Sequence, residues 1–494
     1  MSLIKKIQSL LLDENEKIFI KSNNILFNKK SEDTILIQCT EDYFYLKLYT
    51  LLLMQESKNI KNVVGLINIP FKTSKKDKLL IIPFLLKVIL NKLRIIKLKK
   101  LYSSIGVSQF YSFNNLSFIN IVRSFKIFNG IKSKKDVLEL KIDDIKVGDL
   151  LYDTVVRFAK EPKLSINSLD IFSNIYRSLN AICLVNLICN KYNISNTFFN
   201  QSVYIYHGVP VRTLLKNKIN VYTSGHFPMF KKLSLDDPFM MSTKKTHLKL
   251  LKEIKLDQKT IDKSLVLFGE RFKGKDDLGV IKHYKMNPYN LNNSITFDED
   301  FEGVLFLHDF YDSHKLFGPE TIFSDFDTWT KYTLNLIRDF NLKIAIKPHP
   351  LQIPESEKYL NNLMREYKDL IWLDPLISNL EIFKKGILFG ISHHGSVLAE
   401  LAYHDIKAIS CSESPPISAY DICYQASNIK EYKDYILKIK ELPKKENLKN
   451  LLGIYYYNNF CSLSDYNINS KLINGINILN SNRYNFTSKD LLLN

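Results

Sequence analysis

Residues 386–411 read GILFGISHHGSVLAELAYHDIKAISC and contain a complete strand–helix–strand unit. The runs GILFGI (386–391) and KAISC (407–411) each suit one buried strand, and the residues from 397 to 402 place apolar side chains at helical spacing. A strand, a helix and a second strand in this order predict a parallel pair joined by a right-handed crossover. We therefore expect an α/β domain around this unit.

The sequence on either side of the unit continues the same alternation. The β-rich runs GVLFL (303–307), KIAIK (343–347) and LIWL (370–373) alternate with segments of helical periodicity. The pattern predicts a doubly wound domain of Rossmann type over 270–440, in which ligands bind beyond the carboxyl ends of the strands. Residues 441–494, rich in Lys, Asn and Tyr, are predicted to form a closing helix and an irregular tail.

The first half of the chain, residues 1–269, is less regular and is predicted to form a separate N-terminal α/β domain. Its apolar runs suggest strands within 17–20, 34–38, 63–69, 202–206 and 220–223, mixed with helical stretches.

Composition limits the class of protein. The chain has 494 residues, 45% of them hydrophobic and 12% aromatic, which suits two to four globular domains. A net charge of +18 attracts anions, but no RNP stretch, zinc pattern or recognition motif accompanies it, so a nucleic-acid-binding protein is only an alternative. The 6 cysteines form no CxxC pair, which predicts reduced thiols, no zinc site and a cytoplasmic protein.

One segment suggests contact with a membrane surface. Residues 78–101 (KLLIIPFLLKVILNKLRIIKLKKL) interleave apolar side chains with lysines and Arg94. Such a helix would lie in the lipid interface with its cations against phosphates, or else be a core helix with a solvated end. No uninterrupted run of about 18 apolar residues and no signal peptide is present, so we expect at most peripheral association.

The strongest local motif is Lys347-Pro348-His349-Pro350, directly after the strand-like run KIAI. Each proline keeps the residue before it out of the helical region, so the strand must end and Lys347 and His349 are held extended. A cation and an imidazole would then stand at the carboxyl edge of the sheet, where an anionic ligand docks. The alternative is a rigid turn with incidental polar side chains.

A second motif follows another predicted strand, at Ser392-His393-His394-Gly395-Ser396. The N–H groups at the start of the next helix, with Gly395 and the Ser396 hydroxyl, would bind a phosphate. Glu400 lies one turn further on and would reach a ribose hydroxyl, so the motif predicts a nucleotide. An ordinary strand–turn–helix with a serine cap and a solvated glutamate is the alternative.

Two groups in the first half are candidates for proton transfer. Asp153 ends the block GDLLYD (148–153), and His207 lies in YHGVP after the predicted strand 202–206. Either group can act as a general base, and we assign Asp153 to this role with His207 as the substitute.

The HP pair after a strand, the serine turn and the following glutamate resemble the donor half of GT-B glycosyltransferases that build bacterial surface polysaccharides. The similarity is to capsule and lipopolysaccharide enzymes of the Kdo-transferase and bacterial sialyltransferase kind, and it covers about 270–430. The resemblance implies two Rossmann-like domains facing a cleft, a CMP-sugar donor carrying Kdo or a nonulosonic acid, and His349 and Pro350 as the HP pair. The turn reads SHHGS here rather than a plain Ser-Ser, which leaves the nucleotide base open.

The sequence thus predicts a metal-independent glycosyltransferase without cofactor, cytoplasmic or peripheral on the inner membrane, that takes a nucleotide sugar and a glycan or glycolipid acceptor. Alternatives are a metal-dependent transferase using Asp325 and Asp327 or the acidic 298–300, a CDP-polyol phosphotransferase of teichoic-acid type, a sugar-nucleotide epimerase, and a noncatalytic scaffold. The residues assigned to donor binding are Lys347, His349, Pro350, Ser392, His393, His394, Gly395, Ser396 and Glu400.

Overall fold

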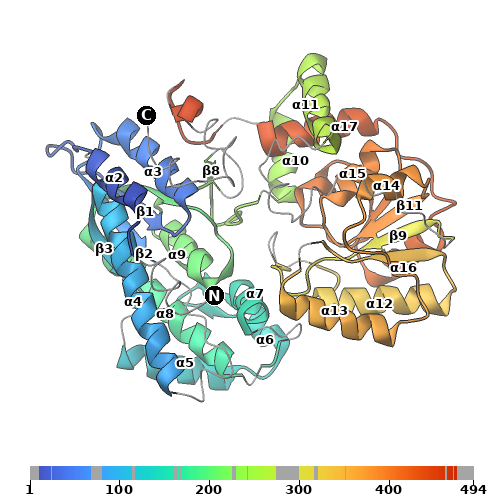
Figure 1. Cartoon of the computed structure of the whole chain (residues 1–494), viewed down its shortest axis with the longest axis horizontal. Helices are drawn as coiled ribbons and strands as arrows, with labels where there is room; N and C mark the ends of the chain where they lie inside the picture. The colour runs from blue at the N-terminus through green and yellow to red at the C-terminus, as the bar shows by residue number, and fades with distance from the viewer. Residues whose placement is uncertain are drawn as a thin grey trace. The chain divides into compact units, whose positions relative to one another are not determined.

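The computed structural model (Figure 1) describes residues 11–23, 25–67, 81–113, 117–159, 164–166, 168–224, 230–241, 243–273, 300–315, 321–350, 352–461, 464–470 and 472–475. The chain divides into two compact units. Unit 1 is Met1–Ala159, Ser165–Met240 and Ser464–Asn494, and unit 2 is Lys160–Leu164 and Met241–Leu463.

The sheet of unit 2 is parallel and lies where the sequence predicted it. Its strands run side by side in the order β10-β9-β11-β12-β13, and Trp372 adds a parallel bridge to Ile346 at the outer side of β10. Counted along the chain with the Trp372 segment as third, this is the order 3-2-1-4-5-6 of a doubly wound domain. The strands are β9 (Gly303–Phe306), β10 (Ile344–Lys347), β11 (Phe389–Ser392), β12 (Lys407–Ser410) and β13 (Tyr424–Gln425).

Helices cover both faces of this sheet. Figure 1 shows α12 and α13 on one face and α14 and α15 on the other. Trp329 on α12 is fully buried, and its indole N–H donates to the Tyr432 hydroxyl at 2.9 Å. A Cβ at Gly390 of β11 would come within 2.5 Å of Leu401, so glycine permits the close approach of α15 to the strand. The helices are α10 (Lys244–Glu253), α11 (Gln258–Glu270), α12 (Phe326–Asp339), α13 (Pro354–Glu366), α14 (Asn379–Lys384), α15 (Val397–Tyr403), α16 (Ile429–Leu437) and α17 (Leu448–Tyr456).

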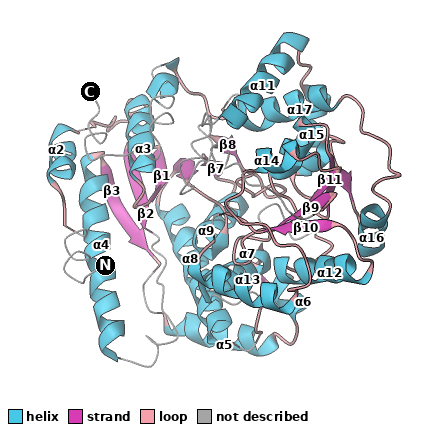
Figure 2. Cartoon of the chain, turned by 45° about the vertical axis from the view of Figure 1, so that its right-hand side comes forward, coloured by secondary structure: helices cyan, strands magenta, loops and turns pink. Residues whose placement is uncertain are grey.

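Unit 1 repeats the same topology. Its sheet has the order β3-β2-β1-β6-β7-β8, which is again 3-2-1-4-5-6 along the chain, and only the last strand is antiparallel. Helices flank the strands (Figure 2). The strands are β1 (Thr34–Cys39), β2 (Asn62–Ile67), β3 (Val107–Ser112), β6 (Ile194–Phe199), β7 (Asn220–Thr223) and β8 (Lys231–Lys232), with a separate hairpin of β4 (Lys141–Ile142) and β5 (Ile145–Lys146). The helices are α2 (Glu14–Ser22), α3 (Tyr43–Glu56), α4 (Ile81–Ser104), α5 (Phe118–Gly130), α6 (Lys134–Leu138), α7 (Gly148–Ala159), α8 (Leu169–Lys191) and α9 (Tyr204–Lys216).

The fold class predicted from the sequence, α/β with two Rossmann-like domains, is therefore confirmed, while two of the predicted strands are wrong. Residues 17–20 lie in α2, which begins with a capping box between Asp13 and Glu16. Residues 204–206 open α9, so His207 and Pro210 are inside a helix rather than in a turn after a strand. Short apolar runs fit a helix and a strand equally well, and here the helices prevail.

The units divide at Met240 and Met241, whereas the sequence placed the boundary at 269 and 270. Helix α11 belongs to unit 2 because it packs on α17, where a Cβ at Gly453 would come within 2.6 Å of Ile261. The predicted tail 441–494 is also divided. From Ser464 the chain belongs to unit 1, where the Tyr466 ring lies 5.0 Å from that of Phe198.

One described helix, α8, is long and apolar enough to cross a membrane by length and composition. About 56% of its most apolar window is buried in the protein, and it packs against α5, α7 and α9. Burial on this scale is typical of a core helix.

Candidate functional site

The crevice of unit 2 lies where its strand order reverses, between β9 and β11. Phe306 at the end of β9 is in register with Ser392 at the end of β11, and both strands run in the same direction. Ligands of doubly wound domains bind beyond the carboxyl ends of the strands at this point of reversal, and we use the term crevice for this position in unit 2.

A cluster of four histidines stands at this crevice. His308 follows β9, and His393 and His394 follow β11. Nε2 of His314 lies 3.1 Å from Nε2 of His393, whose Nδ1 lies 2.7 Å from Nδ1 of His394. A neutral imidazole has one N–H and one acceptor nitrogen, so His393 accepts from one neighbour and donates to the other.

Within the cluster His314 and His393 are buried and His308 and His394 are half-buried, and these surroundings lower the pKa of three of the rings. The His308 ring stacks on Phe326 with ring centroids 4.6 Å apart, and its Nε2 lies 3.4 Å from Oγ of Ser392. Burial, and then the neighbouring imidazoles, hold the pKa of His308, His393 and His394 well below the usual 6.5. At neutral pH these three rings therefore offer N–H donors without formal charge.

Lys347 supplies a cation at the end of β10. Its side chain is only 5% exposed, and Nζ donates to the carbonyl oxygen of Pro375 at 3.2 Å. Burial lowers the pKa of Lys347 from 10.5 to about 8, although the nearby carboxylates of Glu400 and Asp374 act to raise it. Lys347 is thus charged at neutral pH at a position where its charge is poorly solvated.

The structure brings the two predicted motifs together. The half-buried His349 acts electrostatically on His308, and Glu400 on Lys347. Asp309 joins the loops after β9 and β10, because its Oδ2 accepts from the backbone N–H of Ile353 at 3.2 Å. Pro350 is half-buried in the same loop.

The serine turn differs in detail from the prediction. Ser396 is the N-cap of α15, but its exposed hydroxyl makes no capping bond. A Cβ at Gly395 would lie 3.0 Å from Oγ of Ser392 and 3.6 Å from Cε1 of His308, so a side chain there would crowd both residues. Glu400 is buried rather than solvated, and its Oε2 accepts from Asn379 at 2.9 Å.

Two members of the site, His314 and Lys315, were missed in the sequence. Both are nearly fully buried, and Nζ of Lys315 donates to Oγ1 of Thr321 at 2.8 Å. The available signal was the segment HDFYDSHK (308–315), which places two histidines and a lysine after a predicted strand. Its irregular spacing has no helical or strand period, so the sequence does not show which side chains turn inward.

In unit 1, His207 occupies the corresponding switch point between β1 and β6. Nε2 of Gln38 on β1 lies 2.6 Å from Nδ1 of His207, and Gln38 Oε1 accepts from the N–H of Asn200 at 3.4 Å. Burial lowers the pKa of His207 to about 4, so the ring is neutral at pH 7.

Asp153 is buried on α7, which packs against α9, the helix that carries His207. The helices are joined by Asp149 and Arg212, whose buried side chains form two hydrogen bonds of 2.6 Å. Arg212 holds the pKa of Asp149 below its usual value against the opposing effect of burial. Asp149 therefore has a structural role, and Asp153 lies one turn further along the same helix.

Among the described residues, no group of three or more His, Cys, Asp and Glu side chains is arranged to hold a metal ion. Asp325 caps α12 by accepting from the N–H of Thr328 at 2.7 Å, and Asp327 accepts from the Tyr359 hydroxyl. These two carboxylates thus stabilise a helix start. The other acidic candidate, 298–300, lies outside the described residues except for Asp300.

No protein-family model matches the chain, and no curated protein matches it. Solved structures resemble it only distantly. The UDP-GlcNAc 2-epimerase of Methanocaldococcus jannaschii is 9% identical, with 85% of this chain and 97% of that chain covered and a TM-score of 0.30. KpsC of Thermosulfurimonas dismutans, a beta Kdo 2,4 transferase, is 10% identical, with 53% and 79% covered and a TM-score of 0.32. A glycosyltransferase of Rickettsia africae is 10% identical, with 94% and 99% covered and a TM-score of 0.28. These scores carry no assignment, and the fold stated above rests on the two parallel sheets themselves.

Proposed function

We propose that this protein is a glycosyltransferase of GT-B arrangement that binds a nucleotide-sugar donor in the crevice of unit 2. The observation that carries the proposal is the convergence of Lys347, His349 and the histidine cluster at the switch point of a doubly wound sheet, where nucleotides bind in such folds. The resemblance of the HP pair and the serine turn to the donor half of surface-polysaccharide transferases supports the same reading.

The side chains of the crevice suit the leaving group of a sugar transfer. As the glycosidic bond to the donor breaks, negative charge grows on the nucleotide phosphate. Lys347 meets this charge with a cation, and the neutral imidazoles and the Ser396 hydroxyl meet it with hydrogen bonds from preorganised donors. Because only 5% of Lys347 is exposed to solvent, water screens its interaction with the phosphate poorly.

We assign the general base to unit 1. Asp153 is kept as the candidate and His207 as the substitute, because burial lowers the pKa of His207 to about 4 and so leaves its ring neutral and able to accept a proton at pH 7. Glu400 is assigned to holding Lys347 in its charged form, since its carboxylate raises the pKa of that lysine. We propose CMP as the nucleotide, Kdo or a nonulosonic acid as the sugar, and a bacterial surface glycan or its lipid-linked precursor as the acceptor.

Calorimetry with CMP, CDP, UDP and GDP tests the donor site. His349→Ala should keep the melting temperature and weaken CMP binding at least about tenfold, the loss expected for one charge-assisted contact. Asn361→Ala, an exposed change on α13, serves as the matched control. Unchanged affinity in His349→Ala, or binding of none of the four nucleotides, would contradict the proposal.

Transfer itself is tested with a CMP-sugar against CDP-glycerol, with product analysis by mass spectrometry. Transfer from CDP-glycerol alone would show a polyol phosphotransferase, and conversion of the sugar nucleotide without an acceptor would show an epimerase. We propose that turnover needs no metal, because Asp325 and Asp327 are engaged in capping and hydrogen bonding. Loss of turnover in EDTA would refute this.

We propose a cytoplasmic protein in peripheral contact with the inner membrane, but α5 supports this contact better than residues 78–101. On α4, Lys97 pairs with Glu16 at 2.7 Å and Leu101 is buried, so part of that segment serves the interior. Helix α5 instead exposes Phe118 by 78% and Phe125 by 60%. Replacing both with serine should reduce cosedimentation with phosphatidylglycerol vesicles, and unchanged cosedimentation would exclude α5.

A further inference from the structure

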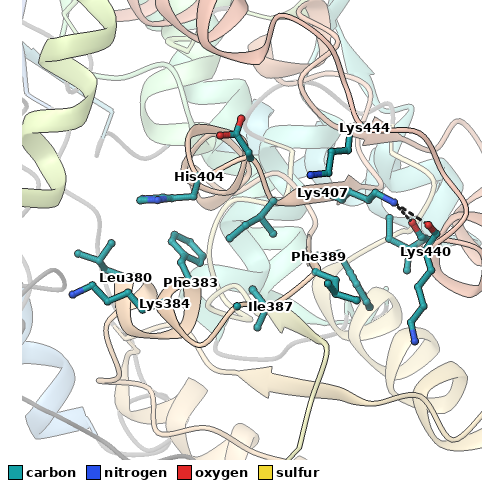
Figure 3. A pocket seen from close by; sticks show the side chains of 14 residues that line it. Leu380, Phe383, Lys384, Ile387, Phe389, His404, Lys407, Lys440 and Lys444 are labelled. Atoms are coloured by element: carbon teal, nitrogen blue, oxygen red, sulfur yellow. Dashed lines mark hydrogen bonds between the residues drawn. The ribbon is translucent and has the colours of Figure 1, made fainter.

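A second pocket of unit 2 opens at the opposite edge of the sheet from the crevice. It has a volume of about 850 Å³, within the range of small-molecule sites, and surrounds the amino ends of β11 and β12 (Figure 3). Phe389, the first residue of β11, lines this pocket, whereas Ser392, the last residue, belongs to the crevice. A four-residue strand spans on the order of 10 Å, so the two sites are separate.

The inner surface of the pocket is apolar. In the view of Figure 3, Phe383, Ile387 and Phe389 lie between Lys384 on one side and a group of three lysines on the other. The side chain of Leu388 at the mouth is 51% exposed, although it is large and apolar. Exposed apolar surface inside a concave site indicates a ligand with an apolar part.

The rim of the pocket carries four lysines and one carboxylate, that of Asp405, which pairs with Lys449 at 3.7 Å. Two of the lysine charges remain for a ligand. Lys407 donates to the carbonyl oxygen of Ile439 at 2.8 Å, and Lys440 pairs with Glu302 at 2.7 Å. Lys384 and Lys444 are exposed and form no ion pair with any residue of the part of the chain that the structure describes.

The pocket has few groups that recognise a base or a sugar. Its described lining contains no Ser, Thr, Asn, Gln, Tyr, Trp or Arg side chain. The one neutral polar side chain is His404, whose ring lies 5.2 Å from that of Phe383 and whose Nε2 is buried without a hydrogen-bond partner among the described residues. A nucleotide or a free glycan would find few partners for its hydrogen-bonding groups here.

We propose that this pocket binds an acidic single-chain amphiphile, with the chain on the apolar lining and the phosphate or carboxylate head at the lysine rim. The long apolar wall and the two uncompensated lysines match such a molecule in shape and in charge. The site does not rest on the proposed transferase function, because it shares no residue with the crevice.

Calorimetry of the full chain with dodecyl phosphate, below its critical micelle concentration, tests the proposal. We expect saturable 1:1 binding that is at least about tenfold tighter than that of dodecyl maltoside, which has the same chain and a neutral head. Lys384→Gln with Lys444→Gln, which removes the uncompensated lysine on each side of the apolar wall, should weaken binding about fivefold, the effect of one solvent-exposed charge contact with the head group. Leu388→Glu, which places a carboxylate at the mouth, should abolish it.

The matched control is Lys358→Gln with Lys368→Gln, which removes two exposed lysines of the same unit outside the pocket and should leave binding within about twofold of the unmodified chain. Melting curves establish that all variants are folded. The proposal is overturned if dodecyl phosphate fails to saturate, if dodecyl maltoside or inorganic phosphate binds as tightly, or if the Lys384 and Lys444 pair is dispensable.

Discussion

Replacing Lys347 with methionine should make the protein more stable at pH 7 while weakening donor binding. The lysine pKa falls from 10.5 to about 8 on folding, so between these values the unfolded chain binds a proton that the native state does not. Stability therefore rises with pH from about 8 to 10.5, and below pH 8 the native state carries the full penalty of the buried cation. Methionine has a similar unbranched shape and no charge, so it removes this penalty.

The magnitude follows from the two pKa values. At roughly 1.4 kcal/mol for each pH unit between them, the buried charge destabilises the native state by about 3 kcal/mol at pH 7. Losing the hydrogen bond to Pro375 offsets about 1 kcal/mol of the gain. The net increase of about 2 kcal/mol corresponds to roughly 4–8 °C in the melting temperature of a domain of this size.

Differential scanning calorimetry of Lys347→Met from pH 7 to pH 10 measures the effect. The increase should shrink almost to zero at pH 10, where the unfolded lysine is itself losing its proton. Lys358→Met, on the exposed face of α13, is the control and should change stability by less than about 0.5 kcal/mol. A lower melting temperature at pH 7, or a gain that persists at pH 10, would refute the assignment of Lys347 as a buried, destabilising cation kept for ligand binding.

Three further outcomes are expected. The pKa of His207 is about 4 in the native state and 6.5 in the unfolded chain, so this ring should contribute about 2 kcal/mol to the fall in the free energy of unfolding from pH 7 to pH 5. His207→Gln should reduce that fall when stability is measured by urea titration. An unchanged fall would contradict the burial of the ring. Arg212→Met leaves Asp149 buried without its partner and should lower the free energy of unfolding by about 3–5 kcal/mol, part of which Asp149→Leu should restore; a loss below about 1 kcal/mol would refute the pairing. Ser396→Ala should change the free energy of unfolding by less than about 0.5 kcal/mol, because the Ser396 hydroxyl makes no capping bond. Asp325→Ala should lower the free energy of unfolding by about 1 kcal/mol, because it removes the cap of α12. Equal losses, measured by circular dichroism, would show that Ser396 is an ordinary cap.

The strands that the sequence predicted correctly are those marked by a local pattern of residues. The runs expected as strands at 303–307, 343–347 and 407–411 coincide with β9, β10 and β12 within a residue or so. Each is a short β-rich run between helical segments, so its own composition and the segments on either side both indicate a strand. The predicted strand 370–373 is reduced to a single bridge at Trp372, since only one residue there pairs with β10.

The errors arose where one local signal competed with another. The run at 17–20 has the apolar character of a strand, but the capping box of Asp13 and Glu16 begins a helix just before it. The boundary between the units was misplaced because α11 shows no break in composition, and its partner α17 lies far along the sequence. The hydrophobic periodicity of one segment does not show which distant segment it packs against.

By itself, the sequence determined that the chain is α/β, that one strand ends at Lys347 and another just before Ser392, and that histidines follow both strands. Only the tertiary structure decided that the strands of each unit lie in the order 3-2-1-4-5-6, and this order brings His308 and His314 beside His393. The burial that lowers the pKa of Lys347 likewise comes from residues distant in sequence. Strand neighbours and burial depend on contacts between remote segments, whereas prolines, caps and apolar periods act within a few residues of the chain.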